Sequence, residues 1–482
     1  MRRYSWVLVF LWLSASLGLA QSAGSAAPKQ AKLTQPSGQL QIDWDQVNAE
    51  STRRLAEYIR IDTSNPPGNE IRGVEWLKQI FQAEGIPFET GESAPGRASI
   101  VARLKGTGKE PALILLSHID VVPVNREFWT VDPFAGEIRD GYLWGRGSVD
   151  MKPLGIASLE TVLLLHRNHV PLRRDVIFLA TADEEAGGNY GAGWVVKNHP
   201  EWIAGASFLV TEGARTMTDN SGKLMYFAIG IAEKTPAWLK LTAKGRAGHG
   251  SIPNPDSSTN RLVAALERLR TYRPPLQVTP AVEYAFRTGA PYEPEPWRSR
   301  FADIRAYIQT PGAYEELLKR PVELAKLENT INITGLEGSI KVNIVPSAAT
   351  ALLDCRLLPN TTIEQWVEQI RKIIQDDSIA IEVIQNFPPT ESKVETPLHT
   401  VIERTVKQHY PAAGVIGSVS QGFTDSHFFR EQGITSYGFM PFPMKDEDWL
   451  RTHGNNERIP VNGFTAGVRL LWEVVYEFSR AQ

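Results

Sequence analysis

Short apolar runs that alternate with helical stretches are the feature of this sequence that most constrains its fold. Four such runs lie at residues 99–104, 112–117, 176–181 and 207–211. They have the nearly continuous apolar character of strands that are buried on both faces. Helical stretches separate several of them, at residues 74–84, 154–168 and 191–198. This order predicts an α/β domain with a mostly parallel sheet and flanking helices, whose chemistry gathers in loops beyond the strand ends.

A different pattern begins near Thr235. The expected elements are a strand at residues 238–243, a helix at 260–272, strands at 332–335 and 342–358, a helix at 363–374 and a strand at 379–385. That β-α-β-β-α-β order predicts a small α+β domain of ferredoxin-like character. Between its first helix and its second strand, residues 274–328 are rich in Pro, Arg and aromatic side chains, which is unlike a plain linker.

The α/β pattern returns from about Asn386, with a helix expected at 401–410, a strand at 436–439 and a closing helix at 464–480. A chain of 482 residues usually forms more than one core, so an interrupted domain fits its length. We therefore expect a catalytic domain in two parts, residues 44–233 and 387–482. Residues 234–386 form the inserted domain between them, with the extra segment 274–328 inside it.

The N-terminus has the pattern of an export signal. Arg2 and Arg3 precede a mostly apolar stretch at residues 6–13, and small residues up to Ala20 offer a cleavage site. A membrane anchor or a first strand are the alternatives, but the stretch is short for a bilayer span and lacks strand alternation. We expect residues 1–20 to be removed on export, 21–43 to form a disordered linker, and no stable membrane anchor.

Charge and cysteine content argue against a nucleic-acid-binding protein and against an enzyme with a cysteine nucleophile. The formal net charge of −3 argues against a nucleic-acid partner, because phosphate binding needs a basic surface. Cys355 is the single cysteine, so no intramolecular disulfide forms. It lies in an apolar strand pattern, which favours a buried structural thiol over a nucleophile.

Five short segments place metal-capable side chains at strand ends or in loops. They contain His118 with Asp120, Asp150, Glu184 with Glu185, Glu212, and His453. Residues two apart at a strand end point to the same side, so Asp120 is placed to hydrogen-bond the ring of His118. Each segment alone fits an ordinary cap, a solvated turn or a surface loop. Together their nitrogen and oxygen donors suit two borderline cations.

A phosphate site is the other interpretation of the glycine-rich segment GRGSVDMK, residues 145–152. It lacks both the phosphate-loop and the dinucleotide-binding spacing, so this alternative is weak.

The segments SHIDVVP, GRGSVDMK, ADEEAGG, TEGA and THGNNE closely resemble the M20 family of zinc peptidases, aminoacylases and deacylases. All five occur in order, and the resemblance extends from about residue 45 to the C-terminus. It implies a di-zinc catalytic domain in which Asp150 bridges two Zn²⁺ ions; Co²⁺ and Mn²⁺ also suit such ligands. His118 and Glu212 would complete one site, and Glu185 and His453 the other.

The resemblance assigns further roles to individual residues. Glu184 would be the general acid/base that activates the attacking water, and Asp120 the partner of the His ligand. In the inserted domain, His249 matches a residue that binds the oxyanion, often in a partner subunit, so the domain would act as a lid and form a homodimer. A flexible surface His is the alternative for this position.

Substrate-binding positions are also implied. Arg356 and Asn343 match residues that hold the substrate carboxylate, although Arg356 also fits an exposed strand position. Gly422 and Thr424 lie in GFTD, which resembles a substrate loop. The long segment 274–328 resembles the larger carboxypeptidase-S-like and fatty-acyl-amino-acid hydrolase branch.

These observations predict an exported hydrolase of an amide bond next to a free carboxylate. Export favours a carboxypeptidase or dipeptidase, and this is the leading hypothesis from the sequence. The aromatic segment favours the alternative, an N-acyl-amino-acid amidohydrolase. A non-catalytic peptide-binding protein is a third hypothesis, which the complete set of ligands and Glu184 disfavours.

Overall fold

The structure is a computed structural model that describes residues 40–481. The predicted signal segment, residues 1–20, and residues 21–39 of the predicted linker lie outside the described residues. Helix α1 (Trp44–Ile59) follows Asp43, whose side chain caps it by accepting the backbone N–H groups of Asp45 and Gln46. Within residues 40–481, no helix is both long and apolar enough to cross a membrane.

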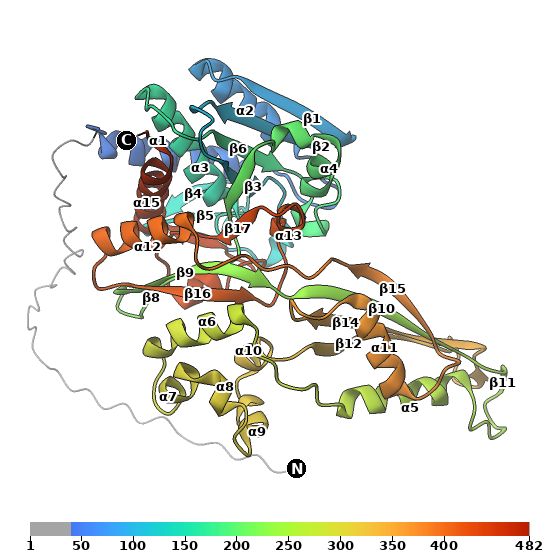
Figure 1. Cartoon of the computed structure of the whole chain (residues 1–482). Coiled ribbons are helices and arrows are strands. Elements are labelled where there is room, and N and C mark those ends of the chain that lie inside the picture. Colours follow the sequence, from blue (N-terminus) through green and yellow to red (C-terminus); the bar gives the residue numbers. More distant parts are fainter. Residues whose placement is uncertain (1–39, 482) are drawn as a thin grey trace, which may run out of the picture. The chain divides into compact units, whose positions relative to one another are not determined.

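A mixed nine-stranded sheet carries the larger part of the described chain (Figure 1). Its strands, in spatial order, are β1 (Phe88–Ala94), β2 (Arg97–Leu104), β6 (Val176–Thr181), β3 (Ala112–His118), β7 (Ala206–Thr211), β17 (Thr435–Gly438), β9 (Leu224–Glu233) and β16 (Gly414–Ser420), with β8 (Thr216–Thr218) beside β9. Strands β6, β3, β7 and β17 are parallel neighbours, whereas β1, β2 and β8 pair antiparallel. The predicted α/β domain with a mostly parallel sheet is confirmed.

Helices cover both faces of this sheet, which explains the continuous apolar strands. On one face lie α1, α3 (Lys152–Arg167) and α15 (Val461–Ser479), and on the other lie α4 (Ala192–Asn198) and α13 (Ser426–Glu431). On β3, Ile114 and Leu116 pack with Val195 and Phe429. Helix α3 is buried on all sides from Lys152 to Leu165 because the sheet and neighbouring helices enclose it.

The inserted domain has its own four-stranded antiparallel sheet. The spatial order is β12 (Thr330–Glu337), β14 (Ala348–Leu357), β10 (Thr235–Lys244) and β15 (Ala380–Asn386). Two helices, α5 (Ser258–Thr271) and α11 (Ile363–Ile374), pack with it. The chain order β10-α5-β12-β14-α11-β15 is the predicted ferredoxin-like arrangement, and Thr362 with Gln365 closes a capping box at the start of α11.

The strand predicted over 342–358 is wrong as a single element. It divides into β13 (Ile344–Val345), which pairs with β11 (Gly248–His249), and β14. Pro346 lies between them and has no N–H to donate to a ladder, so the strand breaks there.

The segment 274–328 folds into short helices: α6 (Pro280–Gly289), α7 (Trp297–Ala302), α8 (Ile304–Tyr307), α9 (Ala313–Leu317) and α10 (Pro321–Leu324). Helix α6 packs along the edge strand β16 of the catalytic sheet. A Cβ atom at Gly417 would lie 2.3 Å from the ring of Tyr284, so glycine permits this approach. The Gly417 N–H also donates to Thr288 Oγ1 at 2.9 Å. This segment therefore contacts the α/β sheet although it is inserted in the smaller domain.

A three-stranded sheet joins two distant parts of the chain. Strand β5 (Tyr142–Trp144) pairs with β4 (Glu137–Arg139) on one side and with β18 (Arg458–Pro460) on the other. The segment that follows His453 is thereby held beside the glycine-rich segment that begins at Gly145. The remaining α-helices of the described residues are α2 (Ile71–Glu84), α12 (Pro397–His409) and α14 (Asp446–Trp449).

Candidate metal centre

The metal-capable side chains gather at the carboxyl ends of neighbouring parallel strands. Strand β3 lies between β6 and β7, and all three run in the same direction. His118 ends β3, Glu184 and Glu185 follow β6, and Glu212 follows β7. The loops beyond such strand ends are where ligands bind in open α/β sheets.

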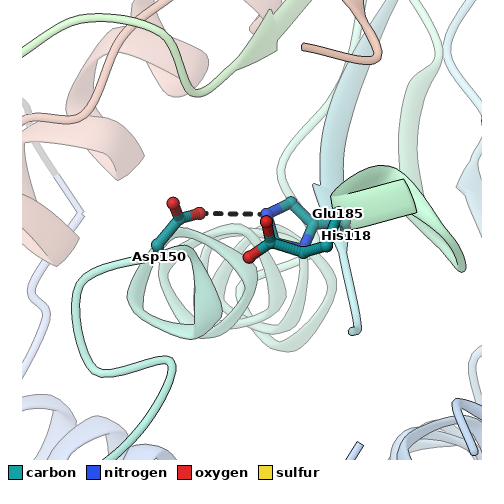
Figure 2. A group of neighbouring side chains, drawn as sticks. All are labelled: His118, Asp150 and Glu185. Atoms are coloured by element: carbon teal, nitrogen blue, oxygen red, sulfur yellow. Dashed lines mark hydrogen bonds and ion pairs between the residues drawn. The ribbon is translucent and has the colours of Figure 1, made fainter. Parts of the chain in front are cut away.

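Five predicted ligands form two groups that share Asp150. The ring Nε2 of His118 lies 3.1 Å from Asp150 Oδ1 and 3.5 Å from Glu212 Oε1. The ring Nε2 of His453 lies 3.2 Å from Asp150 Oδ2 and 3.1 Å from Glu185 Oε2. Figure 2 shows the first contact as a dashed line, with the carboxylate of Glu185 beside the His118 ring. Each oxygen of Asp150 thus faces one histidine.

The backbone of Asp120 fixes the orientation of His118. Its carbonyl oxygen lies 2.9 Å from the ring Nδ1, whereas its carboxylate Oδ1 lies 3.6 Å away. Because a carbonyl only accepts hydrogen bonds, Nδ1 carries the proton and Nε2 is turned toward Asp150. The nearer partner of the ring is therefore the carbonyl of Asp120, in place of the carboxylate contact expected from the sequence.

A left-handed residue directly precedes the two adjacent glutamates, Glu184 and Glu185. Asp183 has φ of 72°, and the turn Glu184–Ala186 follows it. The Asp183 carboxylate accepts a guanidinium N–H of Arg97 at 2.6 Å and the backbone N–H of Tyr190 at 2.8 Å. These bonds hold a backbone conformation that is unfavourable for a residue with a Cβ atom.

Glu184 lies beside the metal-capable group and is buried. Ligand-capable atoms of His118, Glu184 and Glu212 lie within 4.8 Å of one another, and so do those of His118, Asp150 and Glu185. Burial and the charge of Glu212 raise the pKa of Glu184 well above its ordinary value.

The other carboxylates and the histidines of the site change one another's pKa values. Burial, reinforced by the charge of Asp150, raises the pKa of Glu212 to about 8. Hydrogen bonds that the His453 ring donates to the carboxylates of Asp150 and Glu185 raise the pKa of His453 to about 10. Burial opposes the charged ring of His118, but the neighbouring carboxylates outweigh it and raise its pKa. A cation bound by these ligands would favour their deprotonated forms.

The donor set fits divalent cations. Four carboxylates and two imidazoles in one largely buried cluster, with His453 at its exposed side, are costly unless positive charge neutralises the carboxylates. One oxygen of Glu185, Oε1, is buried without a hydrogen-bond partner in the described chain. Mixed imidazole and carboxylate ligands suit Zn²⁺, and equally Co²⁺ or Mn²⁺. The residues present therefore fit two cations that share Asp150.

Two predicted residues of the inserted domain, His249 and Asn343, lie near each other in the structure. His249 on β11 is exposed, and its Nδ1 lies 2.8 Å from Ser251 Oγ. The Gly250 N–H donates to the Asn343 carbonyl at 2.9 Å, so both residues lie on the β11–β13 ribbon. Among residues 40–481, neither side chain hydrogen-bonds to one of the five ligands.

Arg356 lies next to the predicted substrate loop. From β14 its guanidinium donates two hydrogen bonds to Asp354, at 2.8 and 3.1 Å. It also lies over the rings of Trp238 and Phe423, at 5.8 and 5.7 Å from their centroids. Phe423 follows Gly422, so the inserted domain and the loop meet at this point.

Thr424 is buried, and its polar groups are already engaged. Its hydroxyl donates to Glu233 Oε1 at 2.7 Å, and its backbone N–H donates to Glu233 Oε2 at 3.2 Å. The exposed Gly422 donates its N–H to Ser420 Oγ at 3.1 Å. The loop therefore presents the backbone of Gly422 and the ring of Phe423 rather than the Thr424 hydroxyl.

Sequence reasoning missed several polar residues that support the cluster. Asn65 donates to the Asp120 carboxylate at 2.8 Å, and Asp425 accepts from Thr181 Oγ1 at 3.0 Å. Arg146 and Glu457 form a buried pair at 2.6 Å. Asp425, Arg146 and Glu457 lie inside the segments GFTD, GRGSVD and THGNNE, so the signal was present but pointed to their neighbours.

The sequence of this chain matches a known peptidase family and is similar to named proteins. The profile of peptidase family M20/M25/M40 matches residues 114–477. The N-fatty-acyl-amino acid synthase/hydrolase PM20D1 of Xenopus tropicalis is 31% identical over 438 residues, covering 86% of this chain and 78% of that protein. Aminoacylase-1 of Sus scrofa is 28% identical over 435 residues, covering 88% of this chain and 94% of the relative.

A solved structure shares the fold. The M20 family metallo-carboxypeptidase Sso-CP2 from Sulfolobus solfataricus superposes with a TM-score of 0.68 at 19% identity, covering 89% of this chain and 99% of that chain. The predicted catalytic and lid architecture and the predicted enzyme class, an M20-type peptidase or amidohydrolase, are confirmed. Because the family profile extends from β3 into α15, and so over most of the described residues, this chain belongs to peptidase family M20/M25/M40.

Proposed function

We propose that this chain hydrolyses the amide bond of N-acyl amino acids, at a centre that holds two zinc ions. The observation that carries the proposal is the sharing of Asp150 between the two histidine-carboxylate groups, with Glu184 beside them. Support for the acyl substrate comes from the relatives named for N-fatty-acyl amino acids and for aminoacylase activity. Peptides with a free C-terminal carboxylate present the same bond and the same charge, so they form the second arm of the test.

Two cations held by these ligands would supply a water of lowered pKa and would polarise the amide carbonyl. In our proposal Glu184 takes a proton from the attacking water and returns it to the leaving nitrogen. Its burial and raised pKa suit a group that must both accept and release a proton during the reaction. His118, Asp150 and Glu212 would hold one cation, and Asp150, Glu185 and His453 the other.

Substrate positioning is assigned to the inserted domain and the adjoining loop. Arg356 already holds the carboxylate of Asp354 through two N–H groups, which is the geometry that a substrate carboxylate requires. Asn343 would assist it, and the backbone of Gly422 beside Thr424 would line the same region. His249 would bind the oxyanion that develops on the carbonyl oxygen.

A homodimer through the inserted domain belongs to the same proposal. The loop before β13 exposes the whole side chains of Ile340 and Val342, on either side of Lys341 and next to Asn343. Apolar groups in such a position are typical of a surface that a second protein covers. A partner subunit there would also bring a second copy of the β11–β13 ribbon toward a metal centre.

Export is proposed from the N-terminal sequence. Arg2, Arg3 and the apolar stretch that follows support a signal segment that ends at Ala20. N-terminal sequencing of protein from the outer compartment tests this, and a chain that still begins at Met1 contradicts it.

The function is tested with one panel of substrates. Zinc-loaded and chelator-stripped protein are each given N-acetyl and N-dodecanoyl amino acids, the corresponding C-terminal amides, and dipeptides. We expect amine release from the N-acyl amino acids only with zinc, and none from the amides. Preference for dipeptides would instead make the chain a peptidase. Two bound zinc ions with no turnover of any member would favour a peptide-binding protein.

A further inference from the structure

We infer that the buried pair Arg146 and Glu457 is a positioning device that ties the shared ligand Asp150 to the ligand His453. The inference rests on the proposed two-zinc function. Each residue hydrogen-bonds to the backbone of a ligand, Arg146 to that of His453 and Glu457 to that of Asp150. The pair therefore sets whether the second zinc site, made by Asp150, Glu185 and His453, is formed before a cation arrives.

The carboxylate of Glu457 organises the loop that carries Asp150. Its Oε1 accepts the backbone N–H groups of Val149 at 2.7 Å and of Asp150 itself at 3.2 Å. Its Oε2 accepts the backbone N–H of Gly147 at 3.3 Å. A carboxylate that receives three backbone donors while it is wholly buried fixes the path of that loop.

Arg146 connects this carboxylate to His453. Its Nη1 donates to Glu457 Oε2 at 2.6 Å, and its Nη2 donates to the His453 carbonyl at 3.2 Å. The guanidinium also lies 5.4 Å from the ring centroid of Trp129, and its side chain is only 3% exposed. One planar group thus joins the segment of Asp150 to the backbone of His453.

The surrounding backbone leaves these two segments in contact. The Gly145 N–H donates to the Glu457 carbonyl at 3.0 Å, next to the pairing of β5 with β18. Gly147 has φ of 82°, and a Cβ atom there would lie 2.7 Å from Val121 Cγ1. Glycine at position 147 therefore permits this loop conformation, and the carboxylate of Glu457 accepts N–H groups from Gly147 and Val149 within it.

The two zinc sites depend on this device to different degrees. His118 is buried at the end of a central strand, where the sheet holds it. His453 lies in a loop, has φ of 61° and leaves 52% of its side chain exposed. Its position relative to Asp150 relies on Arg146 and Glu457. Loss of the pair should therefore weaken the zinc that His453 binds and spare the zinc that His118 binds.

The test measures zinc binding, which does not require turnover. Full-length Arg146→Lys and Glu457→Gln proteins are equilibrated with chelator-buffered zinc, and bound zinc is measured by mass spectrometry. Lysine keeps the charge of Arg146 but loses its fork, and glutamine keeps one acceptor of Glu457. We expect one of the two zinc equivalents to bind about 10–100-fold more weakly in both variants, as when a group that orients a ligand is removed.

A matched pair elsewhere supplies the control. Arg54 and Glu160 are also joined at 2.7 Å, with side chains 8% and 0% exposed, but lie at α1 and α3 away from the ligands. Arg54→Lys and Glu160→Gln should lower the melting temperature and leave both zinc equivalents unchanged. Two unchanged equivalents in Arg146→Lys and Glu457→Gln would overturn the inference. A wild-type chain that binds no second equivalent would overturn the two-zinc function first.

Discussion

The carboxylate of Asp120 accepts the backbone N–H of Glu184 at 3.1 Å, so the residue that orients His118 also holds the proposed acid/base. It accepts the backbone N–H of Glu185 as well, at 3.2 Å. The interaction with His118 passes mainly through the backbone carbonyl of Asp120, whereas the interactions with Glu184 and Glu185 pass through its side chain. A substitution of the Asp120 side chain should therefore change its contacts with Glu184 and Glu185 and leave the backbone contact with His118 in place.

Asp120→Asn should lower kcat more than it lowers zinc content. The carbonyl that orients His118 remains, but one carboxylate oxygen is replaced by an amide N–H that opposes the backbone donors of the glutamate turn. We expect kcat to fall about 10–100-fold with both zinc equivalents retained at saturating metal. Steady-state kinetics and zinc analysis of one preparation decide this. Loss of the zinc bound by His118 would mean that the side chain orients the ring after all.

Glu184→Gln should remove turnover and leave the metal in place. Glutamine keeps the shape of the side chain but cannot take a proton from water, so the rate should fall about 10²–10⁴-fold. Glu185→Gln is the adjacent comparison, since Glu185 contacts His453 and should cost one zinc equivalent. If the Glu184 variant loses both zinc ions, its assignment as acid/base is wrong.

How far the fold was predictable depends on how each strand is buried. Strands β3 and β6 are enclosed on both faces, so their apolar runs were found at nearly the observed bounds. Strand β9 was missed, although it is equally buried at its end. It contains Gly230, where a Cβ atom would lie 2.8 Å from the Gly213 carbonyl oxygen. A short apolar run with an internal glycine does not distinguish strand from helix.

The site was predictable where a single side chain lies in a recognisable sequence segment. It was less predictable where two interacting side chains are far apart in the sequence. Asp150 and His453 were named from separate segments, and the structure brings them to 3.2 Å. The pairing of Arg146 with Glu457 spans 311 positions, and a buried charge leaves no trace in apolar periodicity. Only the folded chain brings Arg146 and Glu457 together.

Arg356→Lys should weaken the binding of substrates that have a free carboxylate. Lysine cannot present two parallel N–H groups, and loss of a charge-assisted hydrogen bond is worth about 1.5–3 kcal/mol. The expected loss in kcat/KM is therefore about 10–100-fold. C-terminally amidated substrates, which are poor for the wild type, should change little. Equal losses for the acid and the amide would remove Arg356 from carboxylate recognition and leave it a structural role beside Asp354.

Lys234 should make stability depend on pH in alkaline solution. It lies between β9 and β10, wholly buried, and its Nζ donates to the Glu328 carbonyl at 2.7 Å and to Thr330 Oγ1 at 3.2 Å. Burial lowers the pKa of Lys234 to about 7, from an ordinary value of 10.5. Between these two pKa values the unfolded chain binds a proton that the folded chain does not, so stability rises with pH.

The measurement compares urea unfolding of the wild type and Lys234→Met at pH 7, 8 and 9. The free energy of unfolding of the wild type, relative to the variant, should increase by up to about 1.4 kcal/mol for each pH unit. This gain in stability is absent below pH 7, where Lys234 is charged in both the folded and the unfolded chain. It is complete above pH 10.5, where Lys234 is neutral in both. Lys244→Met, at the exposed end of β10, is the control and should give no such slope. Parallel curves for the wild type and Lys234→Met would mean that the buried amine stays charged, with the Glu328 carbonyl and the Thr330 hydroxyl as sufficient partners.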